Sequence, residues 1–551
     1  MRTPLIAAAA LLLAPAPALA DTLVHNAKGT QIDPRGKLQR FEALLIGDDG
    51  RVKQLFAAGD RLPRRVTHMV DAQGRSLLPG LIDAHGHVMG LGLGAIQLDL
   101  VGTRSIAELQ QRLREYAAAN PGQGWLLGRG WNQELWSDKR LPTSADLNTA
   151  VADRPVWLER VDGHASVGNS AALRAAGITA ATKAPKGGRI EKGLFVDAAT
   201  SLVSAKIPTT SAAQYDRALV EAQRLLLSNG LTAVADMGTS IDDWNALRRM
   251  GDAKQLQVRV ISYSSDITPL LSIAGSKPTP WLYDGKLRMA GIKLYADGAL
   301  GSRGAWLKAP YHDMPSTRGL SLIDDAALKA VAMRAAAGGF QVAIHAIGDK
   351  ANDQVIDTFE ALTAAYPGDR RWWIEHAQVL DLADLPRLTK SGIIASMQPT
   401  HQTSDRTMAE ARLGPKRLGG AYAWQTLARS GVALAFGSDF PVELPNPFHG
   451  LSAAVSRQGL DGQPAGGWRP QERVSFEAAL AGFTRGAAFA GLAEDRIGSL
   501  DPGKYADFIL VDRDVSAVAP GELAQTQVLE TWVGGRKVWA RGASADVPPA
   551  R

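Results

Sequence analysis

The feature that most constrains this chain is a pattern that recurs along it: a glycine, a short apolar run, and then a polar or charged residue. Gly230 precedes the apolar run 231–235, and Gly339 precedes the run 340–344. Helices often end at a glycine in the left-handed conformation. Uninterrupted apolar runs are typical of parallel strands that are covered on both faces. The pattern therefore predicts alternating helices and buried parallel strands.

Eight runs of this kind lie between residues 77 and 436, most of them separated by helix-length stretches. Their ranges are 77–88, 231–235, 258–263, 289–295, 340–344, 372–378, 393–397 and 432–436. Eight such units predict an α/β fold, the (β/α)8 TIM barrel, whose active site lies at the carboxyl ends of the strands. The polar residues that follow the runs are therefore expected at the catalytic face.

A chain of 551 residues is long for a single core, so we expect a large domain and a smaller one. The barrel is predicted at 77–497, with an insertion at about 101–215. The end segments 21–76 and 498–545 read as short strands, and neither can bury an apolar face alone. We expect them to pair into one small β-sandwich domain built from both chain ends.

Residues 1–20 read as a secretory signal peptide. Arg2 provides a positive start, residues 5–13 are apolar, and Ala18-Leu19-Ala20 forms a cleavage site before Asp21. The alternative is a short membrane anchor, but the apolar run is too short to span a bilayer comfortably. We therefore expect a periplasmic or secreted protein that has no membrane partner after cleavage.

Charge and cysteine content argue against several classes of function. The net charge is +6, the basic residues are scattered, and the sequence contains no nucleic-acid-binding motif, so no nucleic-acid partner is expected. The chain has no cysteine, which excludes disulfides, thiolate metal sites and cysteine nucleophiles.

Histidines gather at the ends of the predicted strands. His85 and His87 end the first run two residues apart, which places both on one strand face, where they can share a metal ion. His345 and His376 end two further runs, and Asp439 follows the last one. Any one histidine could be an ordinary hydrogen-bonded loop residue. Four of the ten histidines in the chain converging with an aspartate favour a metal centre.

Lys293 lies within the fourth predicted strand, where a buried charge is costly unless it is removed or paired. Three explanations compete at this point. The lysine pairs with a carboxylate, it serves as a neutral amine that forms Schiff bases, or CO₂ converts it to an anionic carbamate that bridges two metals. The nearby histidines and aspartate favour the carbamate.

These residues and their surroundings resemble the metal-dependent amidohydrolase superfamily, and within it the N-substituted formamide deformylase-like branch, amidohydrolase family 3. The matching stretches are LPGLIDAHGH (78–87), KLYADGALGSR (293–303), IHAIGD (344–349), EHAQ (375–378), GSDFPV (437–442) and GSLDPGKYAD (498–507). The resemblance covers essentially all of the mature chain, and the superfamily also builds a β-sandwich from both chain ends.

The resemblance implies a ligand set and a reaction. A carboxylated Lys293 would bridge a metal pair, with His85, His87 and Asp439 on one ion and His345 and His376 on the other. Some members use a single metal, so we expect one or two divalent ions, zinc in the first instance. Asp439 would act as general base toward metal-activated water and then protonate the leaving amine. The alternative for Asp439 is a metal ligand without proton transfer.

Weaker candidates for substrate binding lie outside this set. They are His164 in the insertion, Asp297 four residues after Lys293, His401 after the seventh run, and Trp131 in a group of tryptophans. Each has a structural alternative: a loop histidine, a turn aspartate, a solvated loop residue and a packed indole. Asp83 and Glu375 adjoin metal-site histidines and can orient them, or can simply be buried carboxylates.

The leading hypothesis is therefore hydrolysis of an amide or a related C–N bond in a small-molecule substrate. A Schiff-base lyase that uses Lys293 is the second hypothesis, and a non-catalytic periplasmic protein that binds a metal or ligand is the third. The sequence does not specify an oligomeric state, and a homodimer is the default expectation.

Overall fold

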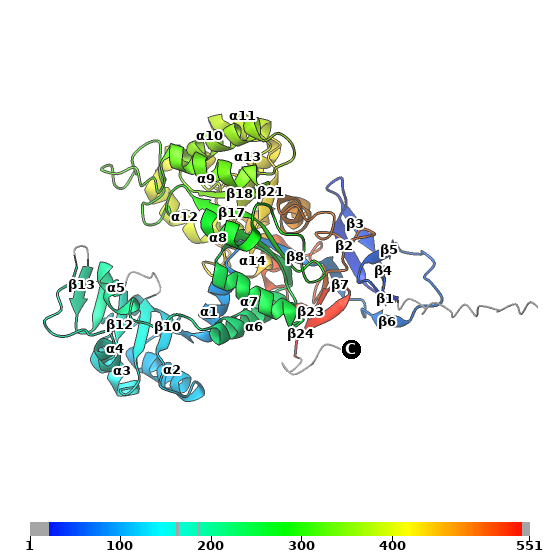
Figure 1. Cartoon of the computed structure of the whole chain (residues 1–551). Coiled ribbons are helices and arrows are strands. Elements are labelled where there is room, and N and C mark those ends of the chain that lie inside the picture. Colours follow the sequence, from blue (N-terminus) through cyan, green and yellow to red (C-terminus); the bar gives the residue numbers. More distant parts are fainter. Residues whose placement is uncertain (1–20, 161–164, 186–187, 543–551) are drawn as a thin grey trace, which may run out of the picture.

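The computed structural model describes residues 21–160, 165–185 and 188–542, so the expected signal peptide and His164 lie outside the described residues. Eight parallel strands form the central sheet (Figure 1). They are β8 (Leu81–Gly86), β15 (Leu231–Thr239), β16 (Arg259–Ser264), β17 (Leu287–Tyr295), β18 (Gln341–Ala346), β19 (Trp373–His376), β20 (Ile394–Met397) and β21 (Leu434–Phe436). The eight predicted strands and the TIM-barrel fold are confirmed.

A backbone contact between the first and last parts of the sheet closes the barrel. Gly86, at the end of β8, forms a parallel bridge with Phe440, and the backbone N–H of His87 donates to the carbonyl of Phe440 at 2.8 Å. The glycine is required here, because a Cβ at position 86 would lie 2.2 Å from the ring of Phe440. Closure therefore brings the segment that carries His87 against the segment that carries Asp439.

Helices surround the barrel and cover the outer face of its strands (Figure 1). They include α1 (Val88–Ile96), α6 (Ala212–Ser228), α7 (Ile241–Asp252), α8 (Ile267–Ala274), α9 (Asp325–Ala337), α10 (Asp349–Ala365), α11 (Leu385–Lys390), α12 (Pro399–Leu413), α13 (Trp424–Arg429), α14 (Pro447–Ser456) and α15 (Phe476–Ala481). Helix α16 (Ala487–Ala490) packs instead in a second core cluster, with Ile82, Tyr263 and Trp373. Helix α6 begins at Ser211, which forms a capping box with Gln214. Its apolar face buries Leu219 and Leu226 in the main core.

The first predicted run, 77–88, is two strands rather than one. Strand β7 (Ser76–Pro79) pairs with the end sheet, and β8 begins the barrel at Leu81. The break falls at Gly80, whose backbone N–H donates to the carbonyl of Asp507 at 2.8 Å. A Cβ at Gly80 would lie 2.2 Å from the Thr232 hydroxyl, so the chain turns there with no room for a side chain.

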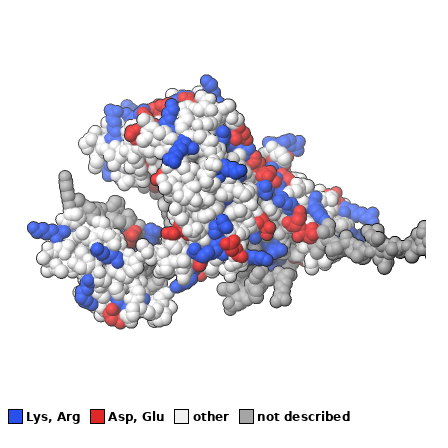
Figure 2. Space-filling view, in the orientation of Figure 1, with Lys and Arg blue, Asp and Glu red and all other residues white. Residues whose placement is uncertain are grey.

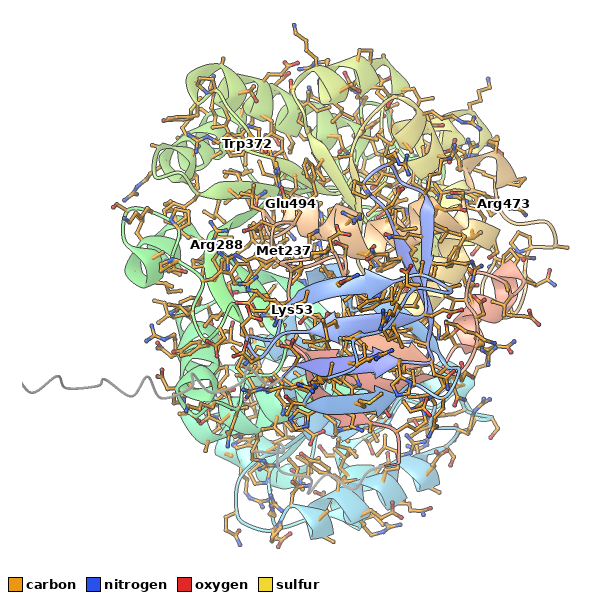
Figure 3. The ribbon with its side chains drawn as sticks, turned by 90° about the vertical axis from the view of Figure 1, so that its right-hand side faces the viewer. Lys53, Met237, Arg288, Trp372, Arg473 and Glu494 are labelled. Carbon is orange, nitrogen blue, oxygen red and sulfur yellow. The ribbon has the colours of Figure 1, made fainter. Side chains whose placement is uncertain are left out.

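The two chain ends share a six-stranded sheet of order β24-β23-β22-β7-β2-β3. Strands β2 (Lys28–Ile32), β3 (Leu38–Phe41) and β7 come from the N-terminal segment; β22 (Phe508–Val511), β23 (Val528–Val533) and β24 (Arg536–Ala540) come from the C-terminal one. A four-stranded sheet made of β1 (Thr22–His25), β4 (Ala43–Ile46), β5 (Val52–Phe56) and β6 (His68–Asp71) packs against it. Figure 3 shows the blue N-terminal strands beside the red C-terminal ones.

An ion pair joins this end domain to the barrel. Nε and Nη2 of Arg259, at the start of β16, lie 2.6 Å and 2.9 Å from the two carboxylate oxygens of Asp507. Both side chains are buried, and the backbone N–H of Gly534 also donates to the same carboxylate at 2.7 Å. Two charges taken out of water together need this kind of bidentate, fully hydrogen-bonded geometry.

The insertion folds as a lobe of its own beside the barrel (Figure 1). Its six-stranded sheet comprises β9 (Leu98–Asp99), β10 (Leu126–Trp131), β11 (Val156–Arg160), β12 (Ala165–Gly168), β13 (Gly188–Glu191) and β14 (Leu194–Asp197). Helices α2 (Ile106–Ala119), α3 (Ser144–Ala150), α4 (Ser170–Ala175) and α5 (Ser201–Ser204) belong to the same lobe. Its apolar residues form cores separate from that of the barrel.

The described surface mixes charges of both signs. On the face shown in Figure 2, Lys and Arg side chains lie among Asp and Glu side chains. Among the residues described, none of the helices combines the length and the apolar character needed to cross a membrane.

Candidate active site

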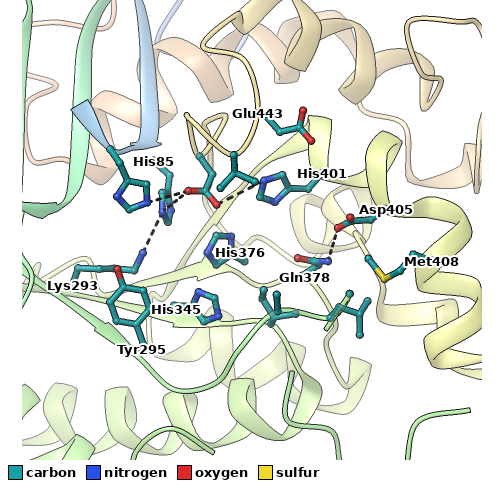
Figure 4. Close-up of a pocket in the computed structure, with 17 residues that line it drawn as sticks. His85, Lys293, Tyr295, His345, His376, Gln378, His401, Asp405, Met408 and Glu443 are labelled. Carbon is teal, nitrogen blue, oxygen red and sulfur yellow. Dashed lines mark hydrogen bonds and ion pairs between the residues drawn. The ribbon is translucent and has the colours of Figure 1, made fainter. Parts of the chain in front are cut away.

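A cavity of about 350 Å³ opens at the carboxyl ends of the barrel strands (Figure 4). This volume suits a small-molecule ligand. The five predicted metal-site residues besides His87 come from different strands: His85 from β8, Lys293 from β17, His345 from β18, His376 from the end of β19, and Asp439 just after β21. All of them line the cavity, as does His87, so the structure brings the whole predicted set together.

His85, His376 and Asp439 form the tightest group. One potential ligand atom from each lies within 4.8 Å of the others, and all three side chains are buried. The Nε2 atoms of His85 and His87 lie 3.4 Å and 3.2 Å from Oδ1 of Asp439. Burial, followed by the nearby charge of Lys293, lowers the pKa of His85 well below its usual value. His85 is therefore neutral, which is the form of imidazole that binds a metal.

Asp83 holds the ends of β8 and β21 together beneath this group. Its carboxylate accepts the backbone N–H of His85 and of Ser438, each at 3.0 Å, and the Ser438 hydroxyl at 2.7 Å. The backbone N–H of Asp439 donates to the carbonyl of His85 at 2.7 Å. Burial raises the pKa of Asp83 to about 7 in spite of these hydrogen bonds.

Three further side chains contact the ring nitrogens that point away from the cavity centre. Oε2 of Glu375 lies 2.6 Å from Nδ1 of His85, and Oε1 of Gln398 lies 2.8 Å from Nδ1 of His376. Oδ1 of Asp297 lies 3.4 Å from Nε2 of His345. Such contacts fix the tautomer and the ring orientation of metal-binding histidines.

The amine of Lys293 is enclosed at the bottom of the cavity. The side chain is 1% exposed, and Nζ lies 3.2 Å from Nε2 of His85. Within the described residues, no carboxylate lies within 4.0 Å of Nζ, so a carboxylate ion pair does not account for this lysine. Burial lowers its pKa, which favours the neutral amine.

The backbone is strained next to the site. His376 and Asp439 have φ values of 73° and 60°, in the left-handed region that side chains other than glycine rarely adopt. Such conformations persist where surrounding contacts enforce them, and they cluster at functional sites. Here they turn both side chains into the cavity, His376 at the end of β19 and Asp439 just after β21.

The donor set fits a divalent cation. The cavity floor combines four imidazoles with one carboxylate and one amine, and these are nitrogen and oxygen donors of the kind that bind zinc. For His85 and His376 the outer ring nitrogen is engaged by Glu375 or Gln398, which leaves the other nitrogen directed into the site. A cation bound there could accept these inner nitrogens as ligands.

Comparison with known proteins agrees with this chemistry. A match to the family described as "Amidohydrolase family" spans residues 68–539. The chain belongs to the amidohydrolase family. It is 35% identical to Protein LONG AFTER FAR-RED 3 of Arabidopsis thaliana over 95% of this chain and 92% of that one. It is 26% identical to N-substituted formamide deformylase of Arthrobacter pascens, over 94% and 97% of the two chains.

Among solved structures, an uncharacterized metal-dependent hydrolase from Pyrococcus horikoshii OT3 superposes with a TM-score of 0.76 at 29% identity. The alignment covers 91% of this chain and 99% of that one. The fold, the predicted family and its formamide deformylase-like branch are confirmed. This amidohydrolase is accordingly a metal-dependent hydrolase that acts on C–N bonds.

The structure places the weaker candidates of this amidohydrolase in different surroundings. His401, on α12, does line the cavity, with Nε2 3.8 Å from Oδ2 of Asp439 and its ring stacked near His376. Its role in substrate binding stays a prediction. Trp131 does not reach the cavity: it is fully buried in the insertion core and donates its indole N–H to the carbonyl of Leu158 at 2.9 Å.

Asp297 is not a substrate ligand either, because its carboxylate is fully used inside the protein. It accepts the backbone N–H groups of Trp306, Ile347 and Gly348 at 2.8–2.9 Å, and it faces His345. It therefore positions the loops after β17 and β18 around the cavity. His164 lies outside the described residues.

Several cavity residues of this amidohydrolase were not singled out in the sequence. They are Tyr295, Gln378, Asp405, Met408 and Glu443. The spacing of His401, Asp405 and Met408 on α12 is a helical-face signal that points to the same side. Gln398 was visible as the polar residue that follows the seventh run, but its contact with His376 required the tertiary structure.

Proposed function

We propose that this amidohydrolase is an exported enzyme that hydrolyses an amide or a related C–N bond of a small molecule, with one or two divalent ions, zinc in the first instance. The observation that carries the proposal is the enclosed amine of Lys293 among the site histidines, without a carboxylate partner. Such a group is costly as an ammonium and useful as a metal-bridging carbamate.

His85, His87 and Asp439 would hold one ion, and His345 and His376 the other, with the carboxylated Lys293 between them. Carboxylation joins Nζ to the carbon of CO₂ and releases one proton, which leaves an anionic carbamate. Burial lowers the pKa of Lys293, which supports this reaction because only the unprotonated nitrogen has a lone pair to offer.

The bound metal would polarise the carbonyl oxygen and lower the pKa of water toward neutrality. Asp439 accepts the proton of the attacking water and transfers it to the leaving nitrogen. Burial works to raise the pKa of Asp439, but the hydrogen bond with His87 helps to hold the pKa below the usual value. Asp439 is therefore ionised, as a proton acceptor must be, and His87 and His401 lie beside its two oxygens.

The substrate class we propose is broad: formamides, N-acyl amines, cyclic amides, carbamates and esters all suit this chemistry. The similarity to a protein named N-substituted formamide deformylase favours formamides as the first group to test. Membership in a hydrolase family favours hydrolysis over the Schiff-base lyase and over the non-catalytic binding protein.

Export is proposed from the signal-like sequence of residues 1–20. If it is correct, protein recovered from the periplasm or the medium of an expressing bacterium begins at Asp21. An intact N-terminus on protein that stays in the cytoplasm would refute export without affecting the proposed chemistry.

Metal content tests the catalytic proposal most directly. Protein is purified without chelators and in the presence of bicarbonate, as wild type and as Lys293→Ala, and metals are measured per chain by mass spectrometry. About two ions in the wild type, with a sharp fall in the variant, would support the carbamate bridge. About one ion per chain, unchanged by the substitution, would indicate that Lys293 is a structural residue and not a metal ligand. A wild type that binds no metal at all would overturn the proposal.

A further inference from the structure

The outer part of the cavity is built by one face of helix α12. His401, Asp405 and Met408 follow one another at helical spacing, and all three line the cavity (Figure 4). Because an α-helix rises about 1.5 Å per residue, Asp405 lies roughly 6 Å along the axis from His401. His401 adjoins Asp439, so Asp405 is about one helical turn farther from the reacting centre.

Asp405 is held in a fixed orientation. Its Oδ2 accepts the hydroxyl of Tyr422 at 2.8 Å and the side-chain amide of Gln378 at 3.1 Å. Both donors are buried, and Tyr422 and Gln378 also contact each other. Among the described residues, none donates a hydrogen bond to Oδ1 of Asp405. The carboxylate is therefore positioned in advance, with one oxygen left to accept a hydrogen bond.

A second carboxylate lies nearby. Glu443 follows β21, and its Oε1 accepts the hydroxyl of Ser404 at 2.6 Å. Asp405 and Glu443 therefore both line the cavity, one from α12 and the other from the segment after β21. A cation that enters the cavity is attracted by both carboxylates.

No side chain of the described residues supplies such a cation. Within the described part of the molecule, neither Asp405 nor Glu443 forms an ion pair, and no arginine lines the cavity. Its lysine, Lys293, lies at the opposite, metal-binding end. The remaining outer wall is apolar, with Met408, Leu300 and Val442.

We infer that Asp405 and Glu443 select substrates whose far end carries a positive charge or hydrogen-bond donors, and disfavour those that end in a carboxylate. This inference rests on the proposed amide hydrolysis and names its substrate class: amides of amines with a second, cationic amino group on an apolar spacer. The apolar wall contacts the spacer, the metal end receives the amide, and the two carboxylates bind the ammonium.

Three matched amides test the inference: N-acetylcadaverine, N-hexylacetamide and N-acetyl-6-aminohexanoate, which differ in the terminal ammonium, methyl or carboxylate. The corresponding formamides are tested in parallel. For the metal-loaded wild type we expect kcat/KM to be about tenfold higher for the cation than for the neutral amide, and about tenfold lower for the anion. The preference for the cation should shrink as ionic strength rises.

Variants assign the preference to the two carboxylates. Asp405→Asn and Glu443→Gln should each reduce the ratio of kcat/KM for the cationic amide to kcat/KM for the neutral amide by about threefold. The double variant should abolish the preference for the cation. Glu410→Gln is the matched control: it removes one negative charge from the same helix, but Glu410 contacts the indole of Trp468 rather than the cavity. Hydrolysis of N-hexylacetamide by the Glu410→Gln control should remain within about twofold of the wild type.

Equilibrium binding separates this inference from the proposed reaction. Calorimetric titration of the three amides ranks their affinities whether or not any is hydrolysed. Cleavage of none of the six amides, together with tighter binding of the cation, would count against the amide-hydrolysis proposal and for the acidic pocket. Equal binding and turnover of cation and neutral amide, or a preference that survives in the double variant, would overturn the inference.

Discussion

Oε2 of Glu375 lies 2.6 Å from Nδ1 of His85, and both side chains are completely enclosed. This contact orients the imidazole whose other nitrogen faces the metal site. We expect Glu375→Gln to weaken metal binding by about 10- to 100-fold, because outer-shell carboxylates contribute that much to affinity. Competition with a fluorescent chelator measures the change. Unaltered affinity in this variant, with Glu410→Gln as the surface control, would contradict the orienting role.

Gly437 lies where a side chain would disrupt the clamp formed by Asp83. A Cβ at this position would lie 2.5 Å from Oδ1 of Asp83 and 2.5 Å from the backbone nitrogen of His85. We expect Gly437→Ala to reduce stability by about 1–3 kcal/mol and to lower the bound metal per chain. Thermal unfolding and metal analysis check both effects.

Gly94→Ala is the matched glycine control for that experiment. Gly94 lies within helix α1 with nothing within 4 Å of an added Cβ. Alanine there should leave metal content unchanged and raise stability by up to about 1 kcal/mol. Equal stability and metal content in the two glycine variants would show that the structure accommodates a Cβ at position 437 without losing stability.

Removal of Asp507 leaves the buried guanidinium of Arg259 without its partner. We expect Asp507→Ala to lower the free energy of unfolding by about 3–5 kcal/mol, because an uncompensated charge then stays in the interior. Asp495→Ala, at a carboxylate whose side chain is 67% exposed, should change it by less than about 1 kcal/mol. Urea titration followed by tryptophan fluorescence compares the two, and similar midpoints would refute the anchoring role of Arg259.

His401 adjoins Asp439 without belonging to the tightest potential ligand group. We therefore expect His401→Ala to keep its metal and to lose about 10- to 100-fold in kcat/KM, since misplacing a general base costs rate rather than metal affinity. Metal analysis beside steady-state kinetics separates the two effects. His449→Ala, on α14 and outside the cavity, is the control. Loss of metal in the His401 variant would instead make this residue a ligand.

Local sequence signals were sufficient for the barrel and for the residues that converge in its mouth. Each strand is a short apolar run, and its last residues face the cavity because the carboxyl ends of parallel strands meet at one edge. The signals around His85, Lys293 and Asp439 therefore predicted both the fold and the candidate site.

Features that depend on packing between distant segments could not be predicted from local sequence signals. Trp131 looked like a binding-wall residue, but the pairing of β10 with β11 and β9 encloses it in the insertion core. Asp297 looked like a substrate ligand, but three backbone N–H groups from later loops take up its oxygens. The role of Asp405 could be inferred only from its hydrogen bonds with Gln378 and Tyr422, which come from other parts of the fold.

Strand β7 lies between β2 and β22 in the end sheet and continues through Gly80 into β8, the strand that carries His85. The neighbour β22 is made of residues 508–511, more than four hundred positions later. During synthesis, β7 can therefore pair with β22, and so anchor β8, only after almost the whole chain has been made. Contacts of such sequence separation form slowly. The catalytic centre can thus assemble only when translation is nearly complete. A chain truncated before β22 would therefore be inactive as well as unstable.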